Sequence, residues 1–261
     1  MPEHPAVLLV GLGSSRRATA AAALNRHADA LRRMGCFGEV LVAALAGGDE
    51  PAEVLRRASA STVVVVPMMM CAGWIAQQVL PPLQAASHGR RSILLCEPIG
   101  MHPAFASLMQ RRAEEHVAHL ELCPDEVTLL LIAHGTLRNP SSAATTERHA
   151  AALQDTGRFR QVVTAYLDQP PRIAEALAPL PSPIVAIGCF AAPGHHATHD
   201  VATGLASRPG NGVSYLGAIG EDESVPLLVR EMVESRLAAE GRCTAPDVPA
   251  EAGCVSHTRR R

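Results

Sequence analysis

Residues 184–200, IVAIGCFAAPGHHATHD, restate an earlier stretch of the chain, VVVVPMMMCAGWIAQQV at 63–79, and this correspondence decides the fold. Two further pairs of segments match: LLVGLGSSR at 8–16 with LIAHGTLR at 131–138, and ILLCEPIG at 93–100 with VSYLGAIG at 213–220. The offsets of the three pairs are 121, 122 and 120 residues. Because this spacing is nearly constant, the chain is predicted to contain a duplicated domain.

At three matched positions, residues that could bind a metal occur in only one of the two copies. There the later copy carries an imidazole or a carboxylate and the earlier copy does not: His134 against Leu12, Asp168 against Gly47, and His196 against Ile75. The sequence therefore predicts that a metal site is built mainly by the second half.

The composition is that of two ordinary globular domains. The 261 residues allow two domains of about 120 residues each, and 48% of the residues are apolar, which is enough for a core in each. A formal net charge of −2 gives no reason to expect nucleic acid or an anionic membrane as a partner. The opening segment lacks a signal-peptide pattern, the apolar run at 63–72 is too short to span a bilayer, and the seven cysteines form no CxxC pair. We therefore expect a cytoplasmic protein with reduced thiols.

Each half alternates strand-like apolar segments with helical ones. Predicted strands lie near 6–10, 39–45, 62–67, 92–96, 127–133, 161–167, 184–189 and 213–217. Predicted helices lie near 18–34, 51–60, 75–86, 103–120, 141–153, 171–178, 197–206 and 224–239. The alternation predicts an α/β fold of two tandem, duplicated domains, each a four-stranded parallel sheet with helices on both faces, with a cleft between them. We expect the domains at 1–122 and 123–240 and a disordered tail at 241–261, which lacks hydrophobic periodicity.

The candidate ligands of the second half all follow predicted strands. His134 comes after the first strand, Asp168 after the second, and His195 and His196 after the third. Ligands of an open parallel sheet bind at the carboxyl ends of its strands, so these side chains are expected at one edge. Two imidazoles and a carboxylate suit Co²⁺, Fe²⁺, Ni²⁺ or Zn²⁺. Taken singly, each residue is more often a capping, packing or turn residue, and only their convergence favours a metal site.

Three segments, AHGTLR, TAYLDQPPRIAEAL and CFAAPGHHATHDV, resemble the signature segments of the ATP-independent (class II) sirohydrochlorin cobalt- and ferrochelatases in their two-domain form. The resemblance extends over about residues 6–238. It implies a chelatase (a lyase) that inserts a divalent metal substrate, Co²⁺ or Fe²⁺ with Ni²⁺ as a further candidate, into a tetrapyrrole. It further implies that no nucleotide is needed and that the reaction belongs to cobalamin or siroheme biosynthesis.

The resemblance also assigns roles to individual residues. His134 and His196 match the family's two histidines, which implies that they exchange metal and protons with the macrocycle nitrogens. Asp168 stands at the family's glutamate position, where it would complete the metal shell or orient a histidine. Asp200 matches the aspartate of the family's D-I-P segment. This chain departs from the pattern twice, because Asp168 is one methylene shorter than glutamate and the D-I-P segment lacks its proline.

Substrate contacts are predicted from the chemistry of a carboxylate-bearing, flat macrocycle. Arg16 and Arg138 occupy equivalent positions in the two halves and are predicted to bind its carboxylates, although a single surface arginine is more often merely solvated. Trp74 could stack on the macrocycle or fill the space left by missing ligands, and His195, at a variable position of its motif, is also assigned to substrate binding. The run Met-Met-Met-Cys at 68–71 is predicted to pack in the core at the cleft floor rather than to relay metal.

Other functions remain open on the sequence. A non-catalytic metal or tetrapyrrole carrier on the same scaffold would fit the shortened acidic residue and the ligand-free first half. A metal-dependent hydrolase would need a further acid or base, for which only His149 and His199 are at hand, both predicted on helix surfaces. The loop at 11–15 lacks the third glycine of a dinucleotide fingerprint and any Walker lysine, so nucleotide binding is not expected. A monomer or a homodimer is compatible with two fused halves.

Overall fold

The computed structural model describes residues 4–13, 18–46, 49–73, 83, 91–138, 140–208, 210 and 212–241. Several predicted features lie outside the described residues: most of the helix at 75–86, nearly all of the tail, Arg16, Gly47, Trp74 and Ile75. Within the described part of the chain, none of the helices combines the length and the apolar character that crossing a membrane requires.

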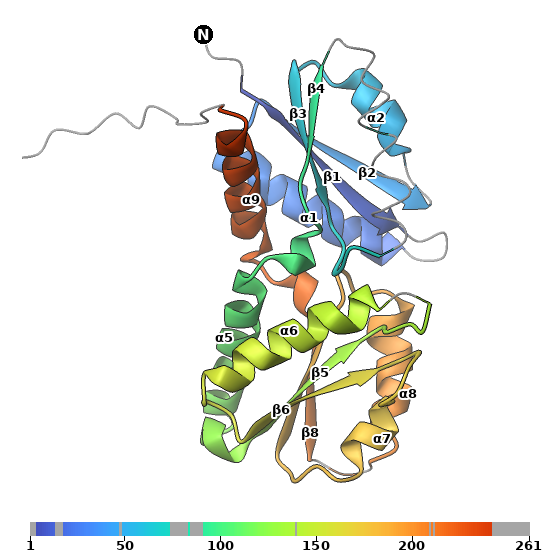
Figure 1. The fold of residues 1–261 in the computed structure, drawn as a ribbon, viewed down its shortest axis with the longest axis vertical. Coiled ribbons are helices and arrows are strands. Elements are labelled where there is room, and N and C mark those ends of the chain that lie inside the picture. The colour runs from blue at the N-terminus through green and yellow to red at the C-terminus, as the bar shows by residue number, and fades with distance from the viewer. Residues whose placement is uncertain are drawn as a thin grey trace, which may run out of the picture.

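Two four-stranded parallel sheets form the framework (Figure 1). The first has the order β2-β1-β3-β4 and consists of β1 (Ala6–Gly13), β2 (Glu39–Ala46), β3 (Thr62–Pro67) and β4 (Ser92–Leu95). The second has the order β6-β5-β7-β8 and consists of β5 (Thr128–Ala133), β6 (Gln161–Tyr166), β7 (Ile184–Gly188) and β8 (Val213–Ala218). All of these strand pairs are parallel. The predicted α/β fold of two tandem, duplicated sheets is confirmed.

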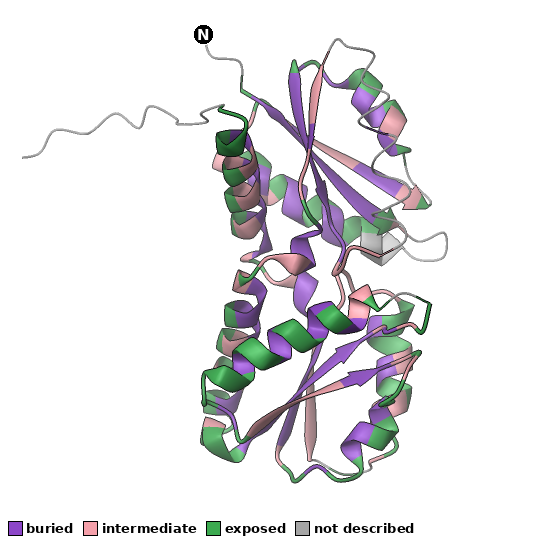
Figure 2. Ribbon diagram, in the orientation of Figure 1, coloured by how far each residue is buried: buried purple, intermediate pink, exposed green. Residues whose placement is uncertain are grey.

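Both faces of each sheet are covered. Successive side chains of a strand point to opposite faces, and in β1 Val7 and Leu9 enter one core while Leu8 enters another. In β5, Leu129 and Leu130 likewise separate into two cores. The central strands are buried along most or all of their length, and the helices expose their outer sides (Figure 2). Burial on both faces explains why these strands read as continuous apolar runs in the sequence.

The helices that cover these faces were largely predicted. They are α1 (Ala18–Met34), α2 (Pro51–Arg57), α5 (Ala104–His119), α6 (Ser141–Asp155), α7 (Ile173–Leu177), α8 (Val201–Leu205) and α9 (Val225–Ala239). Short turns of helix occur at η1 (Ile99–Met101), η2 (Pro124–Glu126), η3 (His196–Asp200) and η4 (Ile219–Glu221). One predicted helix has a different type of first turn. The helix expected at 197–206 begins as a π-helical turn, η3, and continues as the α-helix α8.

The last helix of each half packs against the other half. Helix α5 of the first half packs against α6 and β7, while α9 of the second half packs against α1, β3 and β4 (Figure 1). The Arg236 Nε group of α9 donates a hydrogen bond to the Leu95 carbonyl of β4 at 3.1 Å. One hydrophobic core therefore runs through both halves and includes Leu9 of β1 and Leu131 of β5. The sequence repeats divide near residue 122, but each packed unit contains a helix from across that division.

Two buried histidines join the halves in a symmetric way. His149 of α6 was predicted on a helix surface, and this prediction is wrong, because the residue is only 2% exposed. Its Nε2 lies 2.7 Å from the Gly100 carbonyl oxygen of η1. In the other half, His27 of α1 is 4% exposed and its Nε2 lies 2.8 Å from the Gly220 carbonyl oxygen of η4. A carbonyl only accepts hydrogen bonds, so each Nε2 donates and each helix is tied to a turn of the opposite half.

Candidate metal site and cleft

The second sheet brings the three predicted ligands together at one edge. His134 follows β5, Asp168 follows β6, and His196 opens the π-helical turn after β7. Because β5 lies between β6 and β7 in the sheet, His134 is the middle residue of the three. The rings of His134 and His196 lie 4.7 Å apart between centroids, edge to face at 75°. The Asp168 carboxylate oxygen Oδ2 lies 3.5 Å from His134 Nδ1. The convergence predicted from the strand order is therefore observed.

The backbone fixes the orientation of the His134 ring, and Asp168 lies beside the same ring nitrogen. Nδ1 lies 2.7 Å from the carbonyl oxygen of Gly135, which can only accept, so the proton sits on Nδ1. This tautomer leaves a lone pair on Nε2. Gly135 has a φ of +65°, and a Cβ there would lie 2.7 Å from Tyr166 Cβ, so the turn after β5 requires glycine. Asp168 lies on the Nδ1 side of the ring, and its side chain is 58% exposed.

A carboxylate fixes the second imidazole in the same manner. His196 Nδ1 lies 2.6 Å from Asp200 Oδ2, one turn further along the chain. The hydrogen bond from His196 lowers the pKa of Asp200 below its ordinary value, so the group is a carboxylate at neutral pH and accepts the Nδ1 proton. The lone pair of His196 is thus on Nε2, to which no described residue forms a hydrogen bond. A histidine held by a carboxylate at one nitrogen and open at the other is a typical arrangement for a metal-binding imidazole.

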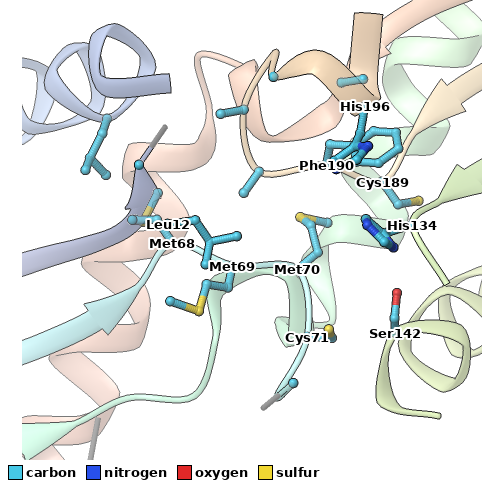
Figure 3. Close-up of a pocket in the computed structure, with 18 of the residues that line it drawn as sticks. Leu12, Met68, Met69, Met70, Cys71, His134, Ser142, Cys189, Phe190 and His196 are labelled. Atoms are coloured by element: carbon cyan, nitrogen blue, oxygen red, sulfur yellow. The ribbon is translucent and has the colours of Figure 1, made fainter. Parts of the chain in front are cut away.

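His134 and His196 border a cavity of about 740 Å³ between the two halves, whereas Asp168 and Asp200 are not among the described residues that line it. Figure 3 shows His134, His196 and Phe190 along one wall, and Leu12, Met68, Met69 and Met70 facing them. Leu12, which occupies the repeat position of His134, is part of the opposite wall. The cleft therefore has an imidazole wall from the second half and an apolar wall from the first.

The sulfur-containing residues of the cavity wall can be compared with the sequence predictions. Met68 and Met69 are each 5% exposed and pack in the core at the cleft floor as expected, whereas Met70 and Cys71 of the same run are only half-buried. All four residues line the cavity. Cys189 lines it as well, and burial raises the pKa of its thiol to about 12. A neutral thiol is a weak metal ligand, so the imidazoles are the stronger donors of this wall.

The remaining predicted site residues are placed as follows. His195 lines the cavity beside His196, at 6.4 Å between ring centroids. Arg138 is exposed on the turn after β5 and is not among the described residues that line the cavity. Arg16 and Trp74 lie outside the described residues. Sequence reasoning missed the link between His195 and Asp200, whose Nε2 and Oδ1 lie 3.4 Å apart. Their spacing of five residues signals a contact only once the π-helical turn is known.

Matches to known proteins extend over both halves. The CbiX family model matches residues 6–116 and 128–236. The probable sirohydrochlorin cobaltochelatase of Halobacterium salinarum is 27% identical in an alignment 219 positions long, which covers 75% of this chain and 75% of that protein.

Solved structures share the two-sheet architecture. A multi-domain protein of Deinococcus radiodurans, described as similar to chelatases but with two additional novel domains, matches with a TM-score of 0.74 and 25% identity. The match covers 88% of this chain and 54% of that protein, so this chain spans about half of its length. A structure of CbiX, described as the terminal enzyme of siroheme biosynthesis in denitrifying bacteria, matches with a TM-score of 0.70 and 24% identity and covers 88% of this chain and 98% of that one.

Proposed function

The chain belongs to the CbiX family, and we propose that it is a sirohydrochlorin chelatase that inserts Co²⁺ or Fe²⁺ into the tetrapyrrole without a nucleotide. The name of the Halobacterium relative supports cobalt as the metal, as in cobalamin biosynthesis. The solved CbiX is described as an enzyme of siroheme biosynthesis, which supports iron as the inserted metal. Imidazole nitrogens accept either ion, so the two histidines themselves do not favour one of them.

One observation carries the proposal: two imidazoles lie 4.7 Å apart on the cavity wall, and each is anchored at Nδ1 by an oxygen, which leaves its lone pair on Nε2. Insertion of a divalent metal requires that two pyrrole N–H protons leave the macrocycle and that the metal loses its water ligands. Neutral histidine serves near pH 7 both as a base and as a metal ligand. In the proposed mechanism, His134 and His196 hold the metal as its waters leave, then take up the two protons as the metal passes to the macrocycle nitrogens.

The cavity supports a large, flat substrate. Its volume of about 740 Å³ lies within the range of about 300–1,000 Å³ that small-molecule pockets span. The apolar wall formed by Leu12 and the methionines would pack against one face of the ring, because flexible thioethers adapt to irregular surfaces. We propose that Arg16 and Arg138 bind peripheral carboxylates of the substrate and that Trp74 and His195 contact the macrocycle.

Metal insertion can be followed directly in the visible spectrum of the pigment. Purified protein is mixed with sirohydrochlorin and Co²⁺, Fe²⁺ or Ni²⁺, and the rate is compared with the spontaneous reaction. We expect acceleration that falls by at least about 100-fold in His134→Ala and in His196→Ala. His119→Ala, an exposed residue at the end of α5, is the matched control and should keep the full rate. Tight pigment binding with no acceleration over the spontaneous rate would identify a carrier instead of an enzyme.

A further inference from the structure

A second group of potential metal ligands lies next to the His134–His196 pair. One ring nitrogen each of His195 and His199 and one carboxylate oxygen of Asp200 all lie within 4.8 Å of one another. The rings of His195 and His199 are stacked, 4.8 Å apart between centroids and inclined by 28°. Two imidazoles and a carboxylate are a donor set for Co²⁺, Ni²⁺ or Zn²⁺.

The π-helical turn explains why these three side chains gather. A π-helix closes its hydrogen bonds between residues i and i+5, so its turn is wider than an α-helical one. Residues four and five positions after His195, namely His199 and Asp200, therefore both lie beside it. Single π-helical turns occur frequently at functional sites.

Neither histidine belongs to the family's signature. In the pattern G-x-H-x-x-x-D, Gly194, His196 and Asp200 occupy the defined positions. His195 and His199 fill variable positions, so this chain adds two imidazoles that the signature does not require.

We propose that His195, His199 and Asp200 form a second divalent-metal site, which captures the ion from solvent and passes it to His134 and His196. The delivery role rests on the proposed chelatase function, whereas metal binding by the three residues does not. The site extends from solvent to the cleft, because His199 is exposed and His195 lines the cavity. Metal–ligand bonds are about 2.0–2.2 Å long, so the rings must approach one another slightly on binding. Their exposure leaves them free to rotate, with the His195 side chain 57% exposed.

Asp200 connects the two sites. Its Oδ2 accepts the hydrogen bond of His196 Nδ1 at 2.6 Å, while its Oδ1 faces His195 Nε2 at 3.4 Å. A metal held by Oδ1 of Asp200 and the imidazoles of His195 and His199 is separated from His196 by one carboxylate group. This short separation, together with an exposed and weakly enclosed site, favours release of the ion toward the cleft.

Titration of the tetrapyrrole-free protein with Co²⁺, followed by the d–d absorption of the bound ion, tests the second site. His199→Ala and His134→Ala should each bind one equivalent less than the wild-type chain, and the double variant two equivalents less. His119→Ala should bind as much as the wild type. An unchanged number of bound equivalents in His199→Ala, or a double variant that loses no more than His134→Ala alone, overturns the proposal.

Insertion kinetics test the delivery step. In His199→Ala the Co²⁺ concentration that gives half the maximal insertion rate should rise by about tenfold, with the maximal rate unchanged. An unchanged half-saturating concentration overturns delivery. The two proposals can fail separately. If the wild-type chain shows no insertion activity but His199→Ala still binds one equivalent of Co²⁺ less, only the chelatase function is refuted. Full insertion activity with no lost equivalent refutes the second site alone.

Discussion

Single hydrogen bonds decide which nitrogen each cleft imidazole offers to a metal. Nδ1 of His134 faces a backbone carbonyl, and Nδ1 of His196 faces the Asp200 carboxylate. The first anchor is part of the chain's own turn and cannot be removed by substitution, whereas the second is a side chain. Asp200 is therefore the residue through which the orientation of a cleft histidine can be tested.

Substitution of Asp200 should reduce metal insertion through His196. In Asp200→Ala the Nδ1 proton loses its acceptor and the ring loses its fixed tautomer, so metal affinity and insertion rate should fall by about 10- to 100-fold. Asp200→Asn retains an oxygen that accepts the same hydrogen bond and should recover part of the loss. Insertion rates of both variants, measured across Co²⁺ concentrations, check this. Equal losses of the maximal rate in the two variants would show that the hydrogen bond does not position His196, because loss of the proposed second site changes only the half-saturating Co²⁺ concentration.

Asp168 should matter less than the histidines. Its carboxylate lies 3.5 Å from His134 Nδ1 and is 58% exposed, and exposed ion pairs contribute about 0–1 kcal/mol. Asp168→Asn is therefore expected to lower the insertion rate by less than about tenfold, far less than His134→Ala. Asp168→Glu, which restores the family's longer side chain, is the companion variant. A loss in Asp168→Asn as large as in His134→Ala would mean that Asp168 ligates the metal directly.

Among the described residues, the bounds of strands and helices were predictable to within a few residues because their apolar patterns are local. The strand β3 is a run of β-branched residues, and Gly35 marks the end of α1 as a residue with a φ of +68°. The π-helical turn at η3 was not predictable, because an i to i+5 bond leaves no compositional mark. The two buried histidines were missed for a similar reason. A polar residue on an amphipathic helix reads as exposed, and its carbonyl partner lies in the other half of the chain.

The histidines that tie α1 and α6 to the opposite half should make stability depend on pH. Burial lowers the pKa of both His27 and His149 below 6.5. Below pH 6.5 the unfolded chain therefore binds more protons than the native state. The stability that the two neutral histidines contribute is thus fully present above pH 6.5, and it is lost as the pH falls toward the lowered pKa values of the folded state. Denaturant unfolding at pH 7.5 and 5.5 should show this loss. It should be smaller in His149→Gln, which can donate a hydrogen bond without titrating, and unchanged in the exposed control His119→Gln.

Across the two halves together, the duplication and the cleft were predictable because three segment pairs repeat at nearly the same offset. The exchange of α5 and α9 was not. Both helices have an apolar face. The hydrophobic pattern of the repeats fits equally well whether each helix covers the sheet of its own half or the sheet of the other half. Three-dimensional packing decides between these arrangements. It places Val229 of α9 in one core with Val64 of β3, so the halves share an interior.

The helix exchange predicts that neither half is stable as a folded monomer. A chain ending at residue 122 would lack α9 over β3 and β4, and the apolar face of α5, including Phe105 and Met109, would lose its partners in the second half. Each fully buried apolar side chain that becomes exposed costs about 1.5–3 kcal/mol, so a few of them exceed the stability of a typical domain. Residues 1–122 and 123–241 should therefore fold only when coexpressed, or as dimers that repeat the exchange between two copies. Size-exclusion chromatography and thermal unfolding check this, and a monomeric half that unfolds cooperatively would show that the exchanged helices are not required.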